Sequence, residues 1–149
     1  ATPASAPVKT SAPSTGDDYT TPSSQVQEEI LLNLLNQERI AQGLSPLTLD
    51  AELSRIARIK SADMRDNHYF AHESPTYGHV SDMLKTFGYS FSGAGENIAH
   101  HATTEKAPAA FMSSDGHRRN ILSSAWQKVG LGIVYDANGY VYVTQIFVR

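Results

Sequence analysis

The chain has 149 residues, of which 40% are hydrophobic, and this is enough for one domain with a buried core. Its formal net charge of −3 argues against broad binding to nucleic-acid phosphates. No run of about 18 consecutive apolar residues predicts a transmembrane segment. Because the chain contains no cysteine, disulfides contribute nothing to its stability and the redox compartment cannot be inferred.

The N-terminal segment, residues 1–24, is rich in Ala, Thr, Pro and Ser. Such a segment has too little apolar surface to offset the entropy of ordering it. We therefore predict a flexible tail or linker over 1–24 and a folded domain over 25–149. The chain begins with Ala1 instead of Met, which fits a removed signal peptide or a trimmed sequence. Export is the favoured interpretation, and an N-terminal segment left from cloning is the alternative.

Four helices are predicted in chain order from apolar residues at helical spacing. The first begins after Ser24, which forms a capping-box pattern with the residue three positions later, and it ends before Gly43. The second runs over 50–67 with an aspartate as its N-cap, and the third is a short helix over 80–87. A fourth is predicted near 104–113.

The last third of the sequence changes to the alternation typical of strands. Hydrophobic residues alternate with small ones over 129–135, Asn138-Gly139 predicts a hairpin turn, and 140–148 follows as the returning strand. Residues 97–101 also have strand potential. Helices that precede an antiparallel hairpin indicate the α+β class.

Three segments that are remote in the sequence carry the residues of chemical interest. His72 lies in the Phe70–Gly78 segment, Glu96 in Gly95-Glu96-Asn97-Ile98-Ala99, and His117 in Ser114-Asp115-Gly116-His117-Arg118-Arg119-Asn120-Ile121-Leu122. Two imidazoles and a carboxylate can bind a divalent metal or exchange protons if folding brings them together.

These segments resemble the CAP superfamily (cysteine-rich secretory proteins, antigen 5 and pathogenesis-related 1). The closest likeness is to its bacterial branch of SCP-like extracellular proteins of the YkwD type. The resemblance covers roughly residues 26–149 and includes the order of four further motifs: Leu34-Leu35-Asn36-Gln37-Glu38-Arg39, Pro46-Leu47, Asp82-Met83-Leu84-Lys85 and Thr144-Gln145-Ile146-Phe147. It implies a three-layer α-β-α sandwich with a central, mainly antiparallel sheet flanked by helices.

The resemblance also implies a cleft with two histidines and two acidic residues. His72, Glu96 and His117 match three of those places, and the fourth falls on Ser114, the third residue after Phe111. This departure removes one carboxylate and weakens any mechanism that needs both.

The predicted metal ligands are His72, His117 and Glu96, with zinc as the candidate divalent metal. We expect His117 in the first turn of a short helix, where the helix dipole favours the neutral imidazole that a metal requires. Glu96 is also a candidate for orienting an imidazole or for acting as a general base. The alternative for Glu96 is that it supports the fold by accepting hydrogen bonds from loop amides.

Ser114, Asn97 and Arg118 complete the predicted ligand cleft. We expect Ser114 to cap a helix instead of acting as a nucleophile, because the sequence has no Gly-x-Ser-x-Gly elbow. Asn97 is expected to satisfy backbone groups, and at most one of Arg118 and its neighbour Arg119 can face the site. The strand neighbours His100 and His101 point to opposite faces, so at most one can contribute.

Three functions are open at this point. The favoured one is a secreted or cell-surface binding module whose cleft holds a divalent metal or an unknown small ligand, with cell-wall or envelope components as partners. The second is a metal-dependent, peptidase-like hydrolase with Glu96 as the base. It is disfavoured because the sequence lacks a His-Glu-x-x-His helix and an evident nucleophile. The third is a purely structural domain of an envelope or spore layer.

Overall fold

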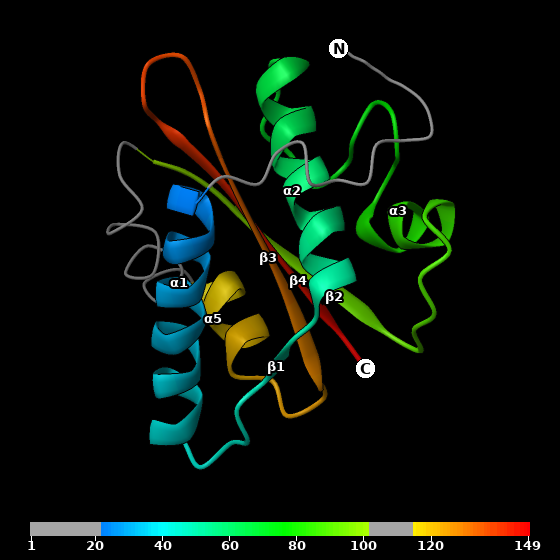
Figure 1. Cartoon of the computed structure of the whole chain (residues 1–149). Coiled ribbons are helices and arrows are strands. Elements are labelled where there is room, and N and C mark those ends of the chain that lie inside the picture. The colour runs from blue at the N-terminus through cyan, green and yellow to red at the C-terminus, as the bar shows by residue number, and fades with distance from the viewer. Residues whose placement is uncertain (1–21, 102–114) are drawn as a thin grey trace.

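The computed structural model describes residues 22–101 and 115–149. The elements follow the predicted order of helices before a hairpin (Figure 1). They are α1 (Pro22–Ala41), β1 (Thr48–Leu49), α2 (Ala51–Asp66), α3 (Val80–Thr86), β2 (Ala94–His101), α5 (Asp115–Ile121), β3 (Lys128–Tyr135) and β4 (Val141–Val148). The helix predicted near 104–113 lies outside the described residues, and so does Ser114.

The four strands form one sheet in the order β1-β3-β4-β2. The short β1 is parallel to β3, whereas β3–β4 and β4–β2 are antiparallel, which confirms the mainly antiparallel sheet. In this order β2 lies at an edge of the sheet, and Glu96 on β2 pairs with Ile146 on β4. The residue that carries the predicted carboxylate is therefore placed on an edge strand.

Helices cover both faces of the sheet, as the three-layer prediction requires (Figure 1). One core cluster joins Leu31 and Leu35 of α1 and Ile121 of α5 to the sheet. The other joins Leu53 of α2 and Met83 of α3 to the opposite face. Because residues on a strand alternate between faces, β2 presents successive side chains to different helical layers.

Two glycines of β3 allow α2 to approach the sheet closely. A Cβ atom added at Gly130 would lie 2.3 Å from the backbone carbon of Leu53, and one added at Gly132 would lie 2.2 Å from the backbone nitrogen of Arg58. No side chain fits in that space. The small residues in the alternating pattern of β3 thus mark the face against which α2 packs.

The predicted ends of the elements agree with the structure to within one residue, except at the start of β2, which is Ala94 instead of Asn97, and at the start of α1. This helix begins at Pro22, so Ser24 lies within its first turn and is buried, instead of serving as the N-cap that the sequence predicted. Proline suits a first helical position because its missing N–H has no partner there. The second helix begins as predicted, with the Asp50 side chain accepting a hydrogen bond from the Leu53 N–H at 2.9 Å.

The predicted hairpin is present, and its turn includes one residue more than the Asn-Gly pair. The N–H of Gly139 donates to the carbonyl of Asp136 at 3.0 Å, and the N–H of Asp136 donates to the carbonyl of Tyr140 at 2.8 Å. Only Gly139 of the turn has a positive φ, 82°. A type I turn followed by one left-handed residue explains this geometry, because it keeps the twist of the flanking strands.

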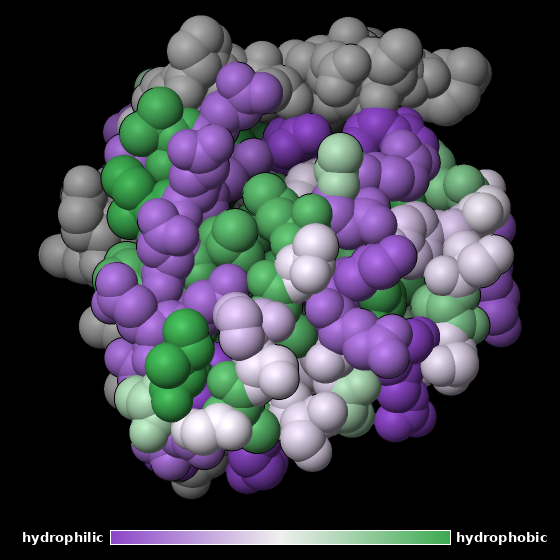
Figure 2. Space-filling model, turned by 60° about the horizontal axis from the view of Figure 1, so that its bottom comes forward, coloured by the Kyte–Doolittle hydropathy of each residue, from purple (hydrophilic) through white to green (hydrophobic). Residues whose placement is uncertain are grey.

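Hydrophobic surface on the face seen in Figure 2 forms separate patches with hydrophilic side chains between them. Four large hydrophobic residues that are exposed belong to α1: Val26, Ile30, Leu34 and Ile40. None of the helices in the described ranges is long and apolar enough to cross a membrane.

Candidate functional site

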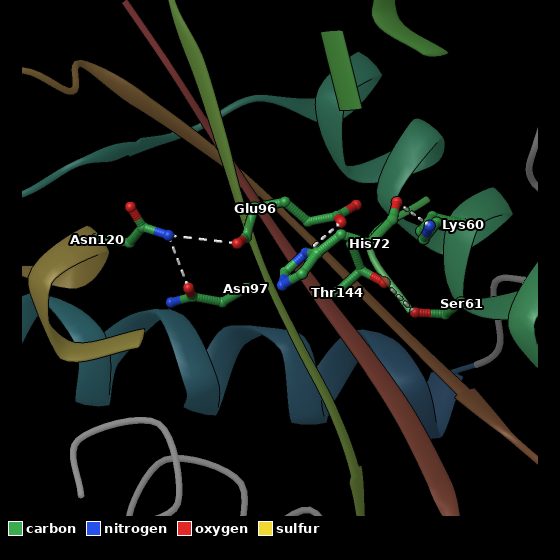
Figure 3. A network of polar contacts seen from close by, with 7 residues as sticks. All are labelled: Lys60, Ser61, His72, Glu96, Asn97, Asn120 and Thr144. Carbon is green, nitrogen blue, oxygen red and sulfur yellow. Dashed lines mark hydrogen bonds and ion pairs between the residues drawn. The ribbon is translucent and has the colours of Figure 1, made fainter. Parts of the chain in front are cut away.

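His72 and Glu96 are in direct contact at the edge of the sheet (Figure 3). The Nδ1 atom of His72 lies 2.9 Å from Oε1 of Glu96. The Glu96 side chain is only 3% exposed, whereas the His72 side chain is 52% exposed. An ionised carboxylate only accepts hydrogen bonds, so Nδ1 of His72 is the donor and its Nε2 carries the free lone pair. The two segments thus meet as predicted, with Glu96 orienting an exposed imidazole.

A buried lysine holds the backbone of the His72 segment. Lys60 of α2 is 1% exposed, and its Nζ atom donates to the carbonyl oxygen of His72 at 2.7 Å. Burial lowers the pKa of Lys60, and the negative charges of Glu96 and Asp63 partly oppose that shift. Lys60 therefore holds the backbone of His72 against α2, and it places a cation near the Glu96 carboxylate.

Asp63 of α2 organises the rest of that segment through its two carboxylate oxygens. Its Oδ2 accepts hydrogen bonds from the hydroxyls of Tyr69 and Ser74, the latter at 2.6 Å. The Ser74 hydroxyl oxygen in turn accepts from the N–H groups of Thr76 and Tyr77, both at 3.0 Å. Burial, together with the hydrogen bond to Asp63, raises the pKa of Tyr69. One buried carboxylate thus closes the segment on both sides of His72.

Asn97 and Asn120 connect β2 to the helix that carries His117 (Figure 3). The fully buried Asn97 donates from Nδ2 to the carbonyl of His117 at 3.1 Å and to Oε1 of Gln145 at 3.0 Å. Asn120 donates from Nδ2 to Oδ1 of Asn97 at 2.9 Å and to the carbonyl of Glu96 at 3.2 Å. Asn97 therefore satisfies backbone groups, as predicted, and positions the backbone of His117.

His117 lies in the first turn of α5, as the sequence predicted. Burial lowers the pKa of His117, and the charge of the nearby His72 lowers it further. A lowered pKa keeps the imidazole neutral near pH 7, which is the form that binds metals. We call His72, Glu96 and His117 the His–Glu site.

The far end of α5 is held by a buried arginine of α1. Arg39 is 1% exposed, and its Nη1 atom donates to the carbonyls of Ile121 at 2.7 Å and Ser123 at 2.8 Å. A cation at the C-terminal end of a helix is favoured by the helix dipole. Arg39, together with Asn97, therefore fixes the direction of α5 at both ends.

The other predicted residues have different placements. Arg118 and Arg119 are both exposed on α5. His100 stacks on Tyr142, with ring centroids 4.0 Å apart, and its Nε2 lies 3.7 Å from Oδ2 of Asp136. Among the residues that the structure describes, no three His, Cys, Asp or Glu side chains are grouped to hold one metal ion. The three-ligand metal set therefore stays a prediction.

Sequence reasoning missed Lys60, Asp63 and Asn120. Asn120 could have been found, because it lies in the Gly-His-Arg-Arg-Asn motif, three residues after the predicted site histidine His117. Lys60 and Asp63 gave no signal, because charged residues on a helix usually face solvent. They are buried here because the segment that contains His72 lies against α2 and bonds to both side chains.

Comparisons with known proteins agree with this fold. The model of the cysteine-rich secretory protein family, abbreviated CAP, matches residues 32–147. The sequence is similar to YkwD of Bacillus subtilis (strain 168), with 45% identity over 137 residues that make up 91% of this chain and 49% of YkwD. This chain thus spans about half the length of that relative.

Two solved structures are similar over most of this chain. An extracellular protein containing a SCP domain from Bacillus anthracis str. Ames has a TM-score of 0.78 and 34% identity, over 87% of this chain and 44% of that one. An outer surface protein from Borrelia burgdorferi also has a TM-score of 0.78, with 16% identity over 84% of this chain and 93% of that one. At that identity, the second likeness concerns the fold alone.

Proposed function

The chain belongs to the CAP family, and on that premise we propose that it is a secreted or cell-surface binding domain whose His–Glu site holds a divalent metal or a small polar ligand. One relative supports the proposed location, since the Bacillus anthracis protein with 34% identity is named an extracellular protein. The partners of such a domain are components of the cell wall or envelope. The proposal concerns this domain only, because its relatives YkwD and the Bacillus anthracis protein are about twice as long.

The observation that carries the proposal is the state of the Glu96 carboxylate. Its Oε1 binds His72, while Oε2 is buried and has no hydrogen-bond partner within the described part of the chain. An unsatisfied buried acceptor costs about 1–3 kcal/mol. A ligand or an ordered water that donates a hydrogen bond to Oε2 recovers that cost. An acceptor left open in this way supports a polar site at Glu96 that a donor can occupy.

The side chains also fit a metal that is held by few protein ligands. His72 offers Nε2 because Glu96 accepts from its Nδ1, and His117 is neutral near pH 7 because its pKa is lowered. These two imidazoles would hold zinc, with Glu96 orienting one of them. Such a metal would supply a Lewis acid with coordination positions left for a ligand.

Zinc titration followed by the imidazole NMR signals tests the proposal. We expect the rings of His72 and His117 to shift together and to return on addition of a chelator. The Glu96→Gln variant keeps both imidazoles but loses the carboxylate that orients His72, so we expect zinc affinity about 10–100-fold lower. The control is His79→Gln, which changes an exposed histidine at the start of α3 and leaves the affinity unchanged.

Two results contradict the proposal. If zinc and small polar ligands leave both rings unchanged and Glu96→Ala only lowers the melting temperature, Glu96 is structural. Turnover of peptide or ester substrates that disappears in Glu96→Gln assigns the site to a metal-dependent hydrolase instead.

A further inference from the structure

A cavity of about 620 Å³ lies between the C-terminal end of α2 and the β3–β4 turn. Its lining includes Arg65, Asp66 and His68 from the end of α2, and Asp136, Asn138 and Tyr142 from the hairpin. None of these residues belongs to the His–Glu site. We propose that this cavity is a second binding site, whose ligand is a neutral saccharide.

The charges of the lining disfavour an anionic ligand. Arg65 is already paired, because its Nε lies 2.7 Å from Oδ1 of Asp66 and its Nη1 donates to the carbonyl of Tyr135 at 3.1 Å. Asp136 then adds a second carboxylate without a second cation in the lining. A phosphate, sulfate or carboxylate group is repelled by this excess of negative charge. The charged side chains of the lining likewise disfavour an acyl chain.

Tyr142 supplies an aromatic ring whose position is fixed in advance. The ring stacks on His100 with an interplanar angle of 9°, and His100 also contacts the ring of Phe70 at a centroid distance of 6.3 Å. An aromatic ring has a negative face and a positive edge. The C–H bonds on one side of a sugar ring are weakly positive and pack against such a ring. A ring held by its neighbours binds without a further loss of rotamer freedom.

His68 gives an independent indication that the cavity has a use. It follows the end of α2 with φ at 57° and is the single non-glycine residue in the described ranges with positive φ. The other four residues in that conformation are Gly43, Gly78, Gly88 and Gly139. Glycine adopts this conformation at helix ends more readily than any other residue. Glycine would fit this backbone with less strain, whereas histidine gives the cavity a side chain that forms hydrogen bonds.

Asp136 and Asn138 suit the hydroxyl groups of a sugar. Oδ1 of Asp136 accepts from the N–H groups of Asn138 at 2.8 Å and Tyr140 at 3.0 Å, which holds the carboxylate in place. Its Oδ2 has His100 as a neighbour at 3.7 Å, beyond hydrogen-bond distance. The Asn138 amide offers both donors and an acceptor. Neighbouring hydroxyls of a sugar donate and accept in the same way.

Amide NMR spectra of the full chain test this assignment. The probes are three neutral tetrasaccharides, namely cellotetraose, maltotetraose and tetra-N-acetylchitotetraose, with putrescine and inorganic phosphate as charged probes. We expect at least one tetrasaccharide to shift the amides of His68, Ala137 and Asn138 in a saturable way. The assignment is overturned if no tetrasaccharide does so, or if a charged probe alone shifts these amides.

Two variants separate binding from folding. His68→Gly relieves the left-handed backbone, so we expect a higher melting temperature together with about fivefold weaker saccharide binding, the effect of one neutral hydrogen bond. Asn138→Ala should weaken binding to a similar extent, while Asn33→Ala on the exposed face of α1 leaves it unchanged. Wild-type affinity in both cavity variants overturns the proposal. Because Glu96→Gln should leave saccharide binding intact, the outcome does not depend on the His–Glu site.

Discussion

Glu28 of α1 and Arg58 of α2 form a buried ion pair. The pair lies beside the part of β3 that has no partner strand on that side, because β1 pairs only with Lys128 and Val129. The Nη1 of Arg58 lies 2.9 Å from Oε1 of Glu28, and Oε2 of Glu28 accepts from the N–H of Ile133 at 3.2 Å. Burial raises the pKa of Glu28, and Arg58 opposes that shift. The carboxylate thus satisfies a backbone group of β3, and the Arg58 cation favours its charged form.

Removing the Arg58 cation should therefore destabilise the folded protein. We expect Arg58→Met to lower the free energy of unfolding by about 3–5 kcal/mol, because it leaves a buried carboxylate without a partner. The double variant Glu28→Gln with Arg58→Met should recover most of the loss. Urea unfolding measures both. Arg55→Met is the matched control, since the Arg55–Glu52 pair is more exposed and should cost about 0.2–1 kcal/mol. An equal cost for Arg58→Met and Arg55→Met would contradict this account.

The Lys60 and Asp63 side chains show the limit of prediction at the residue scale. The sequence identified His72, Glu96 and Asn97, because each lies in a short motif with turn-forming neighbours. It did not identify the two charged residues of α2 that hold the His72 segment. Their burial depends on how the His72 segment packs against α2 in the folded chain. No local sequence pattern predicts that packing.

Among the elements, α2 depends most on close packing. It lies on β3 at Gly130 and Gly132, where an added Cβ would meet the backbone of the helix. The backbone of a helix cannot yield as the end of a flexible side chain can. This contact also sets the position of Lys60 and Asp63, and hence of the His72 segment.

Gly132→Ala should therefore lower the free energy of unfolding by about 1–3 kcal/mol or more, through overpacking of α2 against β3. Gly116→Ala is the control, because the nearest atom to its added Cβ is the flexible end of Arg119 at 4.0 Å. Alanine is the better helix former, so this control should be neutral or stabilising by up to about 1 kcal/mol. Thermal unfolding of the two variants measures the difference. Equal stabilities for the two variants would exclude close packing at Gly132 as the cause.

Prediction at the scale of elements succeeded where periodicity was long and failed at a boundary. The Asp50 cap and the hairpin agree with the sequence reading, whereas the strand predicted over 97–101 begins at Ala94 and therefore also contains Glu96. The start of α1 was placed too late, because Ser24 and Gln27 match a capping box although a proline two residues earlier begins the helix. The proline and the capping box are local signals of similar strength for the start of a helix. Only the packing that buries Ser24 decides between them.

At the scale of the whole molecule, the edge strand β2 brings two helical layers to one place. Its alternating side chains direct Glu96 toward α2 and the His72 segment, and Asn97 toward α5 and the backbone of His117. The order of helices and strands predicted the α+β class, and the family resemblance implied the three layers. The meeting of the two histidines was implied by family resemblance alone, because residues separated by more than forty positions have no periodic relation.

We infer that the rings of His72 and His117 lie close together at one site. The pKa of His117, measured by NMR in the wild type and in His72→Gln, tests this inference most directly. Burial disfavours protonation of His117, and His72, when it is protonated, disfavours it further. We predict that the pKa of His117 rises in His72→Gln at low ionic strength and stays below its ordinary value of 6.5, because burial remains. An unchanged pKa of His117 would mean that the two rings do not share a site, and it would contradict the account.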